Sequence, residues 1–314
     1  MSLASRKAPY LQMIDNVPRS PFLKPEVYRE ATRFQPTAND VILISHPKLG
    51  THWVTQIVLL LLSKGQSPGD LADLVKQAPF IEANGVPVSD RSPRFLRTHF
   101  PFGQLKLERS AKYIYLARNP WDTCVSFYHH VKQAPAFRFQ DGSFEEFVDA
   151  FLKSRVGHVG HLDHVLSGYA QRDEPNVFFL TYEKLKEDTA RSILDLARFI
   201  GEPCASMLDK DTGLMDEIIF KSSVDYMKGK FEVSPEEIQV IFNNAPLPPD
   251  AEAKNTKDQL VKHGIVRKGG VGDWIHHFTP ELLRRMQSWI DDKTRRSDIM
   301  KLWKSQSEAA RLAS

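Results

Sequence analysis

Residues 40–62 read DVILISHPKLGTHWVTQIVLLLL, and this stretch decides the fold. Residues 41–44 are a run of aliphatic, mostly β-branched side chains, which predicts a strand buried on both faces. Residues 46–51 interrupt this run, and Gly50 permits a sharp turn or a close approach to a ligand. From His52 onward the apolar-rich sequence predicts a helix. We therefore expect a strand, a tight loop and a helix in direct succession.

The loop between this strand and helix has the features of an anion site. A helix N-terminus presents unpaired backbone N–H groups and the positive end of the helix dipole. Lys48 adds a positive charge and Thr51 adds a hydroxyl group. In the standard nucleotide-binding loop a lysine follows the last glycine, whereas Lys48 precedes Gly50 here. The stretch thus predicts a P-loop-like phosphate cradle, although an ordinary strand-to-helix turn has the same pattern.

The composition is that of an ordinary globular protein. The chain has 314 residues, of which 41% are hydrophobic and 26% charged, which is enough for a large core. The net charge of +3 suits anionic ligands, but no dense lysine and arginine run indicates a nucleic-acid partner. Cys124 and Cys204 are too few for a disulfide framework, which favours a reducing compartment. The N-terminus lacks a signal-peptide core and the longest apolar run is too short to cross a membrane, so we expect a cytoplasmic protein without a membrane partner.

Further strands are expected at residues 94–96, 112–117 and 176–181, with helical segments between them. This alternation is typical of an α/β fold with a parallel sheet. After the strand at 112–117, Asn119 is the expected N-cap of a helix and Pro120 its first residue.

We predict a single domain over residues 1–314. Residues 1–39 carry many prolines and aromatic side chains and are expected to form an irregular lead-in. Residues 243–274 are expected to form a mobile loop that ends in a basic, glycine-rich clamp, RKGGVGDW at 267–274. Residues 280–314 are predicted to form a polar helical tail.

Three polar residues lie where α/β proteins usually bind ligands, just beyond the ends of the strands. His99 follows one predicted strand and Arg118 another. Ser126 lies about two helical turns after Arg118, so both side chains can face the helix start and bind a second phosphate. Each residue alone also fits a structural role, as an ion pair or a packed polar side chain. The three residues together indicate a ligand site more strongly than any one of them does alone.

Histidines recur at positions 158, 161 and 164 with helical spacing. No carboxylate or cysteine set accompanies them in the sequence, so we do not expect a metal site.

Four segments, in order, resemble the cytosolic sulfotransferase family. That family transfers a sulfonate group from 3′-phosphoadenosine-5′-phosphosulfate (PAPS) to a small hydroxyl or amine acceptor. Residues 46–53, HPKLGTHW, resemble its 5′-phosphosulfate loop, and residues 97–99, RTH, resemble its Lys-Thr-His catalytic segment. Arg118-Asn-Pro with Ser126 resembles its 3′-phosphate segment, and residues 267–274 resemble its C-terminal signature Arg-Lys-Gly-x-x-Gly-Asp-Trp. The resemblance covers nearly the whole chain.

The resemblance implies a fold, a cofactor and a set of functional residues. The fold is a single α/β domain with a central parallel β-sheet flanked by helices, and no metal takes part. His99 is implied to be the general base that removes the acceptor proton, with Lys48 and Ser126 as further catalytic residues. The residues implied to bind the donor PAPS and the product 3′-phosphoadenosine-5′-phosphate (PAP) are Lys48, Leu49, Gly50, Thr51, His52, Trp53, Arg118, Ser126, Tyr182, Ser222, Met227, Arg267, Lys268 and Gly269.

The acceptor is less well defined by the sequence. An apolar pocket favours a phenolic or monoamine acceptor over a bulky sugar. The residues expected to contact the acceptor are Phe22, Phe80, Arg97, His99, Phe100, Phe102 and Phe147. Two alternatives are a nucleotide-dependent kinase, which needs a magnesium-binding acid that is not evident, and a non-catalytic protein that binds PAPS or another small molecule. The presence of His99 argues against the second alternative.

The sequence departs from the family pattern at several positions. Leu49 stands where serine is usual and His52 where threonine is usual, while Arg97 replaces a lysine and Val224 a phenylalanine. These changes affect the loop, the catalytic segment and the adenine side of the donor site.

The short motif through which the family forms dimers is also broken. Ile275, Pro280 and Arg284 replace its lysine, valine and glutamate. We therefore expect a monomer, or a dimer that forms through another surface.

Overall fold

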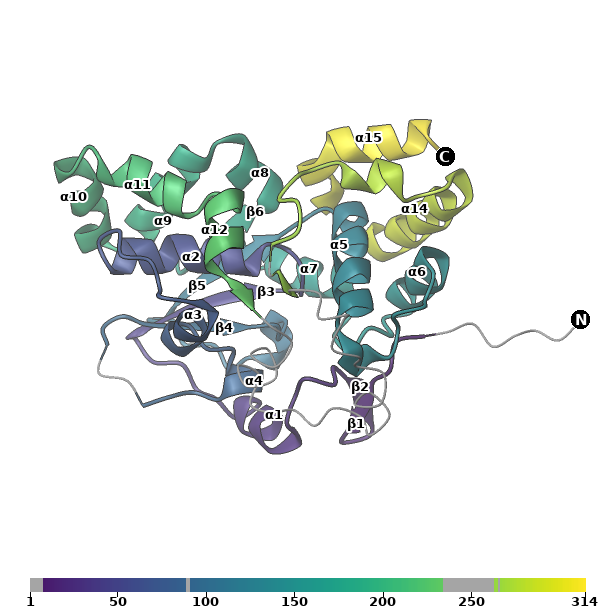
Figure 1. Ribbon diagram of the computed structural model, residues 1–314, viewed down its shortest axis with the longest axis horizontal. Helices are drawn as coiled ribbons and strands as arrows, with labels where there is room; N and C mark the ends of the chain where they lie inside the picture. The colour runs from purple at the N-terminus through teal and green to yellow at the C-terminus, as the bar shows by residue number, and fades with distance from the viewer. Residues whose placement is uncertain (1–7, 89–90, 234–262, 265) are drawn as a thin grey trace, which may run out of the picture.

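The computed structural model describes residues 8–88, 91–233, 263–264 and 266–314. Its centre is a four-stranded parallel sheet with the strand order β4-β3-β5-β6 (Figure 1). The four strands are β3 (Asp40–Ser45), β4 (Arg94–Thr98), β5 (Lys112–Ala117) and β6 (Val177–Thr181). Helices flank this sheet, so the predicted α/β class and the predicted parallel sheet are confirmed.

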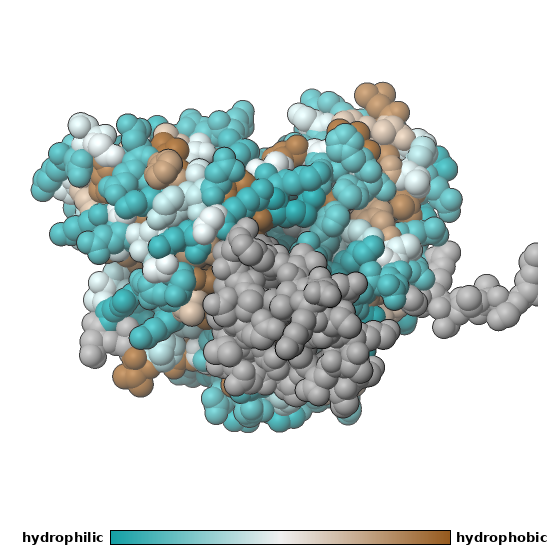
Figure 2. Space-filling model, viewed as in Figure 1, coloured by the Kyte–Doolittle hydropathy of each residue, from teal (hydrophilic) through white to brown (hydrophobic). Residues whose placement is uncertain are grey.

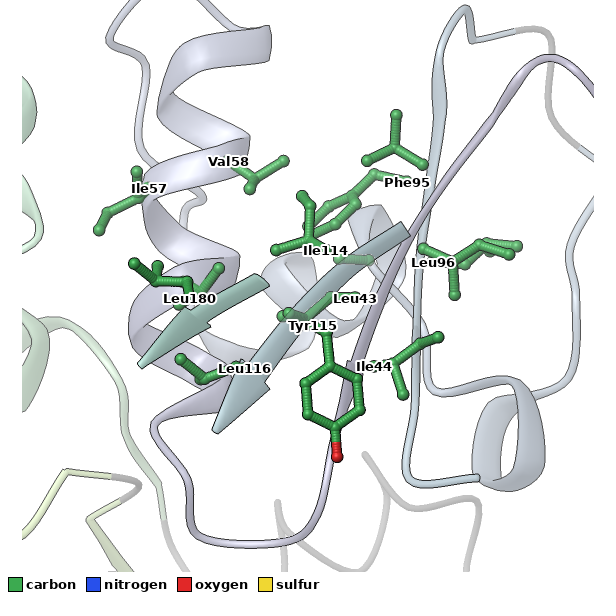
Figure 3. Packing of buried hydrophobic residues seen from close by; sticks show 14 of the residues in the cluster. Leu43, Ile44, Ile57, Val58, Phe95, Leu96, Ile114, Tyr115, Leu116 and Leu180 are labelled. Carbon is green, nitrogen blue, oxygen red and sulfur yellow. The ribbon is translucent and has the colours of Figure 1, made fainter. Parts of the chain in front are cut away.

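The strand β3 lies inside the sheet, and all six of its residues are buried. This burial explains its continuous apolar sequence, because a central parallel strand has no face exposed to water. The helix α2 (Thr51–Leu62) follows directly and places Ile57 and Val58 beside the strands (Figure 3). The helix α7 (His161–Tyr169) packs closely on β5: a Cβ atom on Gly168 would lie 2.2 Å from the ring of Tyr115.

Helices gather in two groups around the sheet (Figure 1). The group beside α2 consists of α8 (Tyr182–Glu187), α9 (Thr189–Ile200), α10 (Glu202–Lys210), α11 (Leu214–Lys221) and α12 (Val224–Lys230). The second group consists of α5 (Pro120–Gln133), α6 (Phe144–Leu152), α14 (Pro280–Thr294) and α15 (Lys304–Leu312). This second group encloses its own cluster of buried apolar side chains.

The remaining elements are short. They are β1 (Gln12–Ile14), β2 (Val17–Arg19), α1 (Pro25–Ala31), α3 (Leu71–Gln77), α4 (Ile81–Asn84), β7 (Glu232–Val233), β8 (His263–Gly264) and the 3₁₀ helices η1 (Phe102–Gln104), η2 (Pro135–Phe137), η5 (Asp273–His276) and η6 (Ile299–Trp303). The N-terminal lead-in is thus more regular than we predicted, because β1 and β2 pair as an antiparallel hairpin.

The start of α5 matches its sequence prediction. The side chain of Asn119 accepts a hydrogen bond from the backbone N–H of Asp122 at 2.8 Å, and Pro120 is the first helical residue. This cap directs the helix N-terminus, and with it Arg118, toward the carboxyl edge of the sheet.

Further observations concern the cysteines, the surface and the limits of the described residues. Cys124 and Cys204 are free and buried. Within the described residues, the structure contains no helix with the length and apolar character needed to cross a membrane. The coloured part of the face shown in Figure 2 is mainly hydrophilic, with hydrophobic residues scattered over it in small groups. The first part of the segment 243–274, predicted to be mobile, lies outside the described residues.

Candidate active site

A cavity of about 530 Å³ lies beyond the carboxyl ends of the strands. It is lined by a residue that follows each of the four strands: Lys48 after β3, His99 after β4, Arg118 after β5 and Tyr182 after β6. This is the edge at which open parallel sheets bind ligands. The structure therefore brings together side chains from across the sequence at one place.

Most of the residues predicted to bind the donor line this cavity. They are Lys48, Gly50, Thr51, His52, Trp53, Arg118, Ser126, Tyr182, Ser222, Met227, Arg267, Lys268 and Gly269. Phe22, Phe80 and His99, from the set predicted to bind the acceptor, line it as well. The two predicted sets thus meet in a single space.

The loop between β3 and α2 has the strained backbone of a close-fitting cradle. Lys48 has a φ of 70° and Gly50 a φ of 105°. A Cβ atom on Gly50 would lie 2.7 Å from the ring of Tyr182, so both the backbone angle and the packing require glycine here. The hydroxyl groups of Ser45 and Thr51 lie 2.8 Å apart and join the end of β3 to the start of α2. The loop therefore holds the first turn of α2 against the cavity.

Three cations meet at one end of the cavity. Burial, followed by the charges of Arg118 and Arg267, lowers the pKa of Lys48 to about 8. The guanidinium group of Arg118 lies 4.0 Å above the ring of Tyr182 and donates a hydrogen bond to the carbonyl oxygen of Gly270 at 2.8 Å. An anion bound here relieves the mutual repulsion of these cations. This end of the cavity therefore fits the phosphate groups of a nucleotide.

The basic clamp near the C-terminus carries an internal acid. Arg267 and Lys268 donate hydrogen bonds to the two carboxylate oxygens of Asp273 at 2.6 and 2.7 Å. Burial raises the pKa of Asp273, but the bonds from Lys268 and Arg267 outweigh this effect and lower it to about 2. Asp273 thus fixes the two cations in place on the cavity wall. The sequence predicted the clamp but not this partner.

His99 occupies the junction between the cationic end and the aromatic part of the cavity. Burial, reinforced by nearby positive charges, lowers the pKa of His99 to about 3, so the ring is neutral at physiological pH. Its Nδ1 atom lies 2.6 Å from the carbonyl oxygen of Ser45, which can only accept a hydrogen bond. Nδ1 therefore carries the proton, and Nε2 is left as the basic nitrogen.

A buried acid holds the backbone of His99. Glu82 accepts a hydrogen bond from the His99 N–H at 2.6 Å and one from the Thr98 hydroxyl at 3.0 Å. Only 2% of Glu82 is exposed. Burial raises the pKa of Glu82 to about 7, although these hydrogen bonds oppose the shift. Glu82 therefore fixes the position of the histidine through its main chain.

Aromatic side chains form the other end of the cavity. Phe80 lies 4.5 Å from His99 and Phe22 lies 5.6 Å from Phe137, measured between ring centroids. Phe127, His130 and His158 complete this wall. The aromatic end suits a flat organic molecule, whose polar group then meets His99.

Five predicted site residues do not line the cavity. The ring of Phe102 stacks on Tyr115, Phe100 packs against Tyr28, and Phe147 packs against Phe127 inside the second cluster. Leu49 is fully buried in the main core. The side chain of Arg97 is also buried: its Nε atom donates to the carbonyl oxygen of Ala78 at 2.5 Å, and its guanidinium lies over the ring of Phe80. These positions do not support direct contact with an acceptor or donor. Arg97 and Phe147 touch residues of the cavity wall, Phe80 and Phe127, from behind.

Several cavity residues were missed by the sequence analysis. His130 follows Ser126 by four positions on α5, so a helical projection from Ser126 identifies it. Phe127 follows Ser126 by one position and lies on a different part of the helix surface, so the projection does not identify it. Glu82, His158 and Phe137 carry no comparable local signal. His158 lines the cavity, whereas the other two histidines with that spacing, 161 and 164, are buried behind it. Within the described residues, no group of three or more histidine, cysteine or acidic side chains is arranged to hold a metal ion.

Comparison with known proteins agrees with this geometry. The family model described as the sulfotransferase domain matches residues 38–298. Human sulfotransferase 1E1 is 31% identical over 282 residues, which cover 85% of this chain and 87% of that protein. The amine sulfotransferase of Oryctolagus cuniculus is 29% identical over 289 residues, covering 88% and 87% of the two chains.

Solved structures show the same fold at lower identity. Mouse sulfotransferase SULT7A1, complexed with PAP, superposes with a TM-score of 0.67 at 24% identity and covers 95% of this chain and 99% of its own. Retinol dehydratase, in complex with androsterone and the inactive cofactor PAP, gives a TM-score of 0.68 at 18% identity and covers 88% and 87% of the two chains.

The fold and the site therefore define an α/β enzyme of the group-transfer class. More specifically, the chain belongs to the sulfotransferase family and is a PAPS-dependent sulfotransferase.

Proposed function

We propose that this protein transfers the sulfonate group of PAPS to a hydroxyl or amine group of a small phenolic or monoamine acceptor, with His99 as general base. The observation that carries the proposal is the continuity of the cavity. One space holds the cationic side chains, the neutral His99 and the aromatic wall, and His99 feels the charge of Lys48 while its ring lies 4.5 Å from that of Phe80. A donor that is anionic and an acceptor that is aromatic can therefore meet at His99.

The residues at the cationic end fit the two phosphate positions of the donor. Lys48 and Thr51, at the start of α2, are placed for the 5′-phosphosulfate group. Arg118, Ser126 and Arg267 are placed for the 3′-phosphate group. The Nε atoms of Arg118 and Arg267 are buried and lack a hydrogen-bond partner among the described residues, which a phosphate oxygen can supply.

The adenine ring requires an aromatic surface rather than a charge. Trp53 and Tyr182 lie 5.3 Å apart between ring centroids, in the cavity that Ser222 and Met227 also line. The two rings offer such a surface. When bound, PAPS supplies the sulfonate group that is transferred.

The proposed role of His99 follows from its tautomer. Because Nδ1–H donates to the carbonyl oxygen of Ser45, Nε2 is unprotonated. Nε2 then acts as the base and accepts the proton of the acceptor hydroxyl or amine. Glu82 holds the His99 backbone while this occurs. Lys48, when protonated, neutralises the charge that grows on the phosphate oxygen as the sulfonate leaves.

The decisive experiment is a product assay. The purified protein is incubated with PAPS or with ATP and a panel of phenols, monoamines, alcohols and sugars, and products are identified by mass. We expect a mass gain of one sulfonate group on phenols or monoamines with PAPS. A phosphorylated product with ATP supports a kinase instead, and binding of PAPS without any product supports a non-catalytic role.

The role of His99 is tested by a substitution. His99→Ala is expected to reduce turnover about 10²-fold or more, because general-base catalysis typically contributes that amount. PAP affinity, measured by calorimetry, is expected to change little because His99 lies beyond the cationic end. The matched control is His276→Ala, which removes an exposed histidine. Turnover of His99→Ala near that of the wild type contradicts the assignment.

A further inference from the structure

The carboxylate that holds the basic clamp has a further neighbour, His277, which the proposed donor site leaves without a role. The Oδ2 atom of Asp273 accepts a hydrogen bond from Arg267 at 2.6 Å, and it also lies 3.6 Å from the Nε2 atom of His277. A separation of 3.6 Å is too long for a hydrogen bond, but a protonated imidazole at that distance is attracted to a carboxylate. Arg267 and His277 thus share one carboxylate oxygen, and Arg267 lines the cavity.

The His277 ring is packed against two helices. It meets the ring of His129 on α5 at an angle of 80°, with the centroids 5.1 Å apart, and it lies 5.6 Å from the ring of Phe144 on α6. The backbone N–H of His277 donates to the carbonyl oxygen of Trp274 at 3.0 Å, at the end of η5. The His277 side chain is 21% exposed. The ring can therefore take a proton from solvent while packing keeps it beside Asp273.

The surroundings of His277 keep its ring mostly neutral at pH 7 while the clamp is free. Burial lowers the pKa of His277, and the negative charge of Asp273 opposes this shift. Repulsion by the cationic forms of three neighbours in the same segment adds to the lowering: Arg267, Lys268 and His276. From α5, His129 contributes no charge near neutral pH, because burial and nearby cations lower its pKa to about 4. The α6 contact is the uncharged ring of Phe144.

A phosphate group at the clamp changes this balance. The buried Nε atom of Arg267 lacks a hydrogen-bond partner among the described residues, and Arg267 is proposed to bind the 3′-phosphate. The negative charge of a phosphate offsets the positive charges that disfavour protonation of His277. Arg267 then divides its hydrogen bonds between the phosphate and Asp273, so the carboxylate oxygen nearest to His277 is less fully neutralised. Both effects favour a positively charged His277.

We propose that His277 takes up a proton from solvent when the 3′-phosphate of the donor binds, and that the protonated ring then shares Asp273 with Arg267. His277 is a positioning residue in this scheme: it acts on the donor through Asp273 and makes donor affinity depend on pH. One N–H bond forms on the ring and no other covalent bond changes. This inference rests on the proposed function and adds a proton-linked regulation of the same site.

The direct test measures the pKa of His277 by NMR in the full-length protein. The protein carries isotope-labelled histidine, and the signal of His277 is the one that His277→Asn lacks. The signal is followed from pH 5.5 to pH 8 without ligand, with PAP and with adenosine 5′-monophosphate (AMP). We expect PAP to raise the pKa of His277, because an opposite charge nearby favours the charged form. AMP lacks the 3′-phosphate and is expected to leave this pKa nearly unchanged.

Calorimetry tests the consequence for donor affinity. A pKa that is higher in the complex strengthens binding as pH falls. We therefore expect the PAP affinity of the wild type, relative to that of His277→Asn, to rise about threefold from pH 8 to pH 5.5. Titration of the phosphate groups themselves cancels in this ratio. The matched control His276→Asn removes the exposed neighbouring histidine and is expected to keep the wild-type pH dependence.

The outcomes separate this inference from the proposed function. A His277 pKa that is the same with and without PAP overturns the inference, and so does a loss of affinity in His277→Asn that is equal at both pH values, because a merely structural role has that effect. A pH dependence that persists in His277→Asn and disappears in His129→Asn also overturns it. In each case the donor site stands. If PAP binds no more tightly than AMP at any pH, the proposed 3′-phosphate site fails, and the inference fails with it.

Discussion

The carboxylate of Asp122 accepts a hydrogen bond from the backbone N–H of Gly272 at 2.9 Å, although the two residues are 150 positions apart. Its other oxygen accepts the N–H of Trp274 at 3.2 Å. Asp122 lies in the first turn of α5 and is 1% exposed. This connection joins the helix that carries Ser126 to the segment that carries the basic clamp. The proposed 3′-phosphate site is therefore assembled from two distant parts of the chain.

The first prediction concerns this connection. An amide at position 122 has one acceptor oxygen instead of two, so Asp122→Asn leaves at least one buried N–H of the clamp unpaired. We expect the free energy of unfolding to fall by about 1–3 kcal/mol and PAP affinity to fall about tenfold. Chemical denaturation and calorimetry measure the two effects. Asp209→Asn, at an exposed position on α10, is the control, and equal PAP affinity in both variants argues against the coupling.

The second prediction concerns proton uptake by Lys48 on donor binding. In the free protein, burial and the charges of Arg118 and Arg267 lower the pKa of Lys48 to about 8. A bound phosphate favours the charged form and raises this pKa again. Between these two pKa values, binding must take up a proton, so PAP affinity is expected to decline as pH rises above 8.

Calorimetry measures this uptake directly. PAP is titrated at pH 9 in two buffers with different ionisation enthalpies, and we expect an uptake approaching about one proton per site. In Lys48→Met the uptake should disappear, whereas Lys64→Met, at an exposed position, should retain it. Proton uptake that persists in Lys48→Met assigns the effect to another group.

Local sequence signals were sufficient for the framework of the site. The buried run of β3, the glycine of the loop and the Asn-Pro start of α5 are each explained by neighbouring residues. The cationic cradle follows from these elements, because parallel strands end at the same edge of a sheet. The positions of Lys48, His99 and Arg118 were therefore predictable.

Long-range packing determined the remainder. Phe102 and Phe137 are both aromatic residues in short 3₁₀ helices, yet Phe102 packs on Tyr115 and Phe137 lines the cavity. Nothing in their local sequence distinguishes the two residues. Whether each ring is buried in the core or lines the cavity depends on which neighbouring helix covers it. The hydrogen bond between Glu82 and the His99 backbone also joins two separate segments, and the sequence of neither segment indicates that they meet.

The third prediction concerns the pH dependence of stability through Glu82. Burial raises the pKa of Glu82 from 4.5 to about 7. Below pH 4.5 the carboxyl group is protonated in both folded and unfolded chains, and its contribution to stability is fully present. As pH rises to 7, the unfolded chain releases the proton first, so this contribution is lost, by up to about 3 kcal/mol.

Glu82→Gln removes this titration. The free energy of unfolding of the variant, relative to the wild type, is expected to rise between pH 5 and pH 8, by up to about 3 kcal/mol. Urea denaturation at the two pH values measures the change. Glu187→Gln, at an exposed position, serves as the control. The prediction is contradicted if the free energies of unfolding of Glu82→Gln and the wild type differ by the same amount at both pH values.

The last prediction concerns assembly. The family's dimer motif needs charged ends of opposite sign, and a self-complementary patch places each substitution in the interface twice. Ile275 is 60% exposed and cannot bind a carboxylate, while Arg284 donates a hydrogen bond to the carbonyl oxygen of Ser314 at 2.6 Å. Pro280 is the first residue of α14 and has no N–H to offer a partner. Arg284 is thus engaged in a contact within the chain, just beyond the end of α15, and is not available to a partner in the usual way.

We therefore predict a monomer at micromolar concentration, or a dimer that forms through another surface. Light scattering after size-exclusion chromatography reports the mass, and crosslinking locates any contact. The triple variant Ile275→Lys, Pro280→Val, Arg284→Glu restores the family pattern and is expected to shift the mass toward a dimer. A stable wild-type dimer crosslinked through residues 275–284 refutes the prediction, because the altered ends would then be compatible with the usual contact.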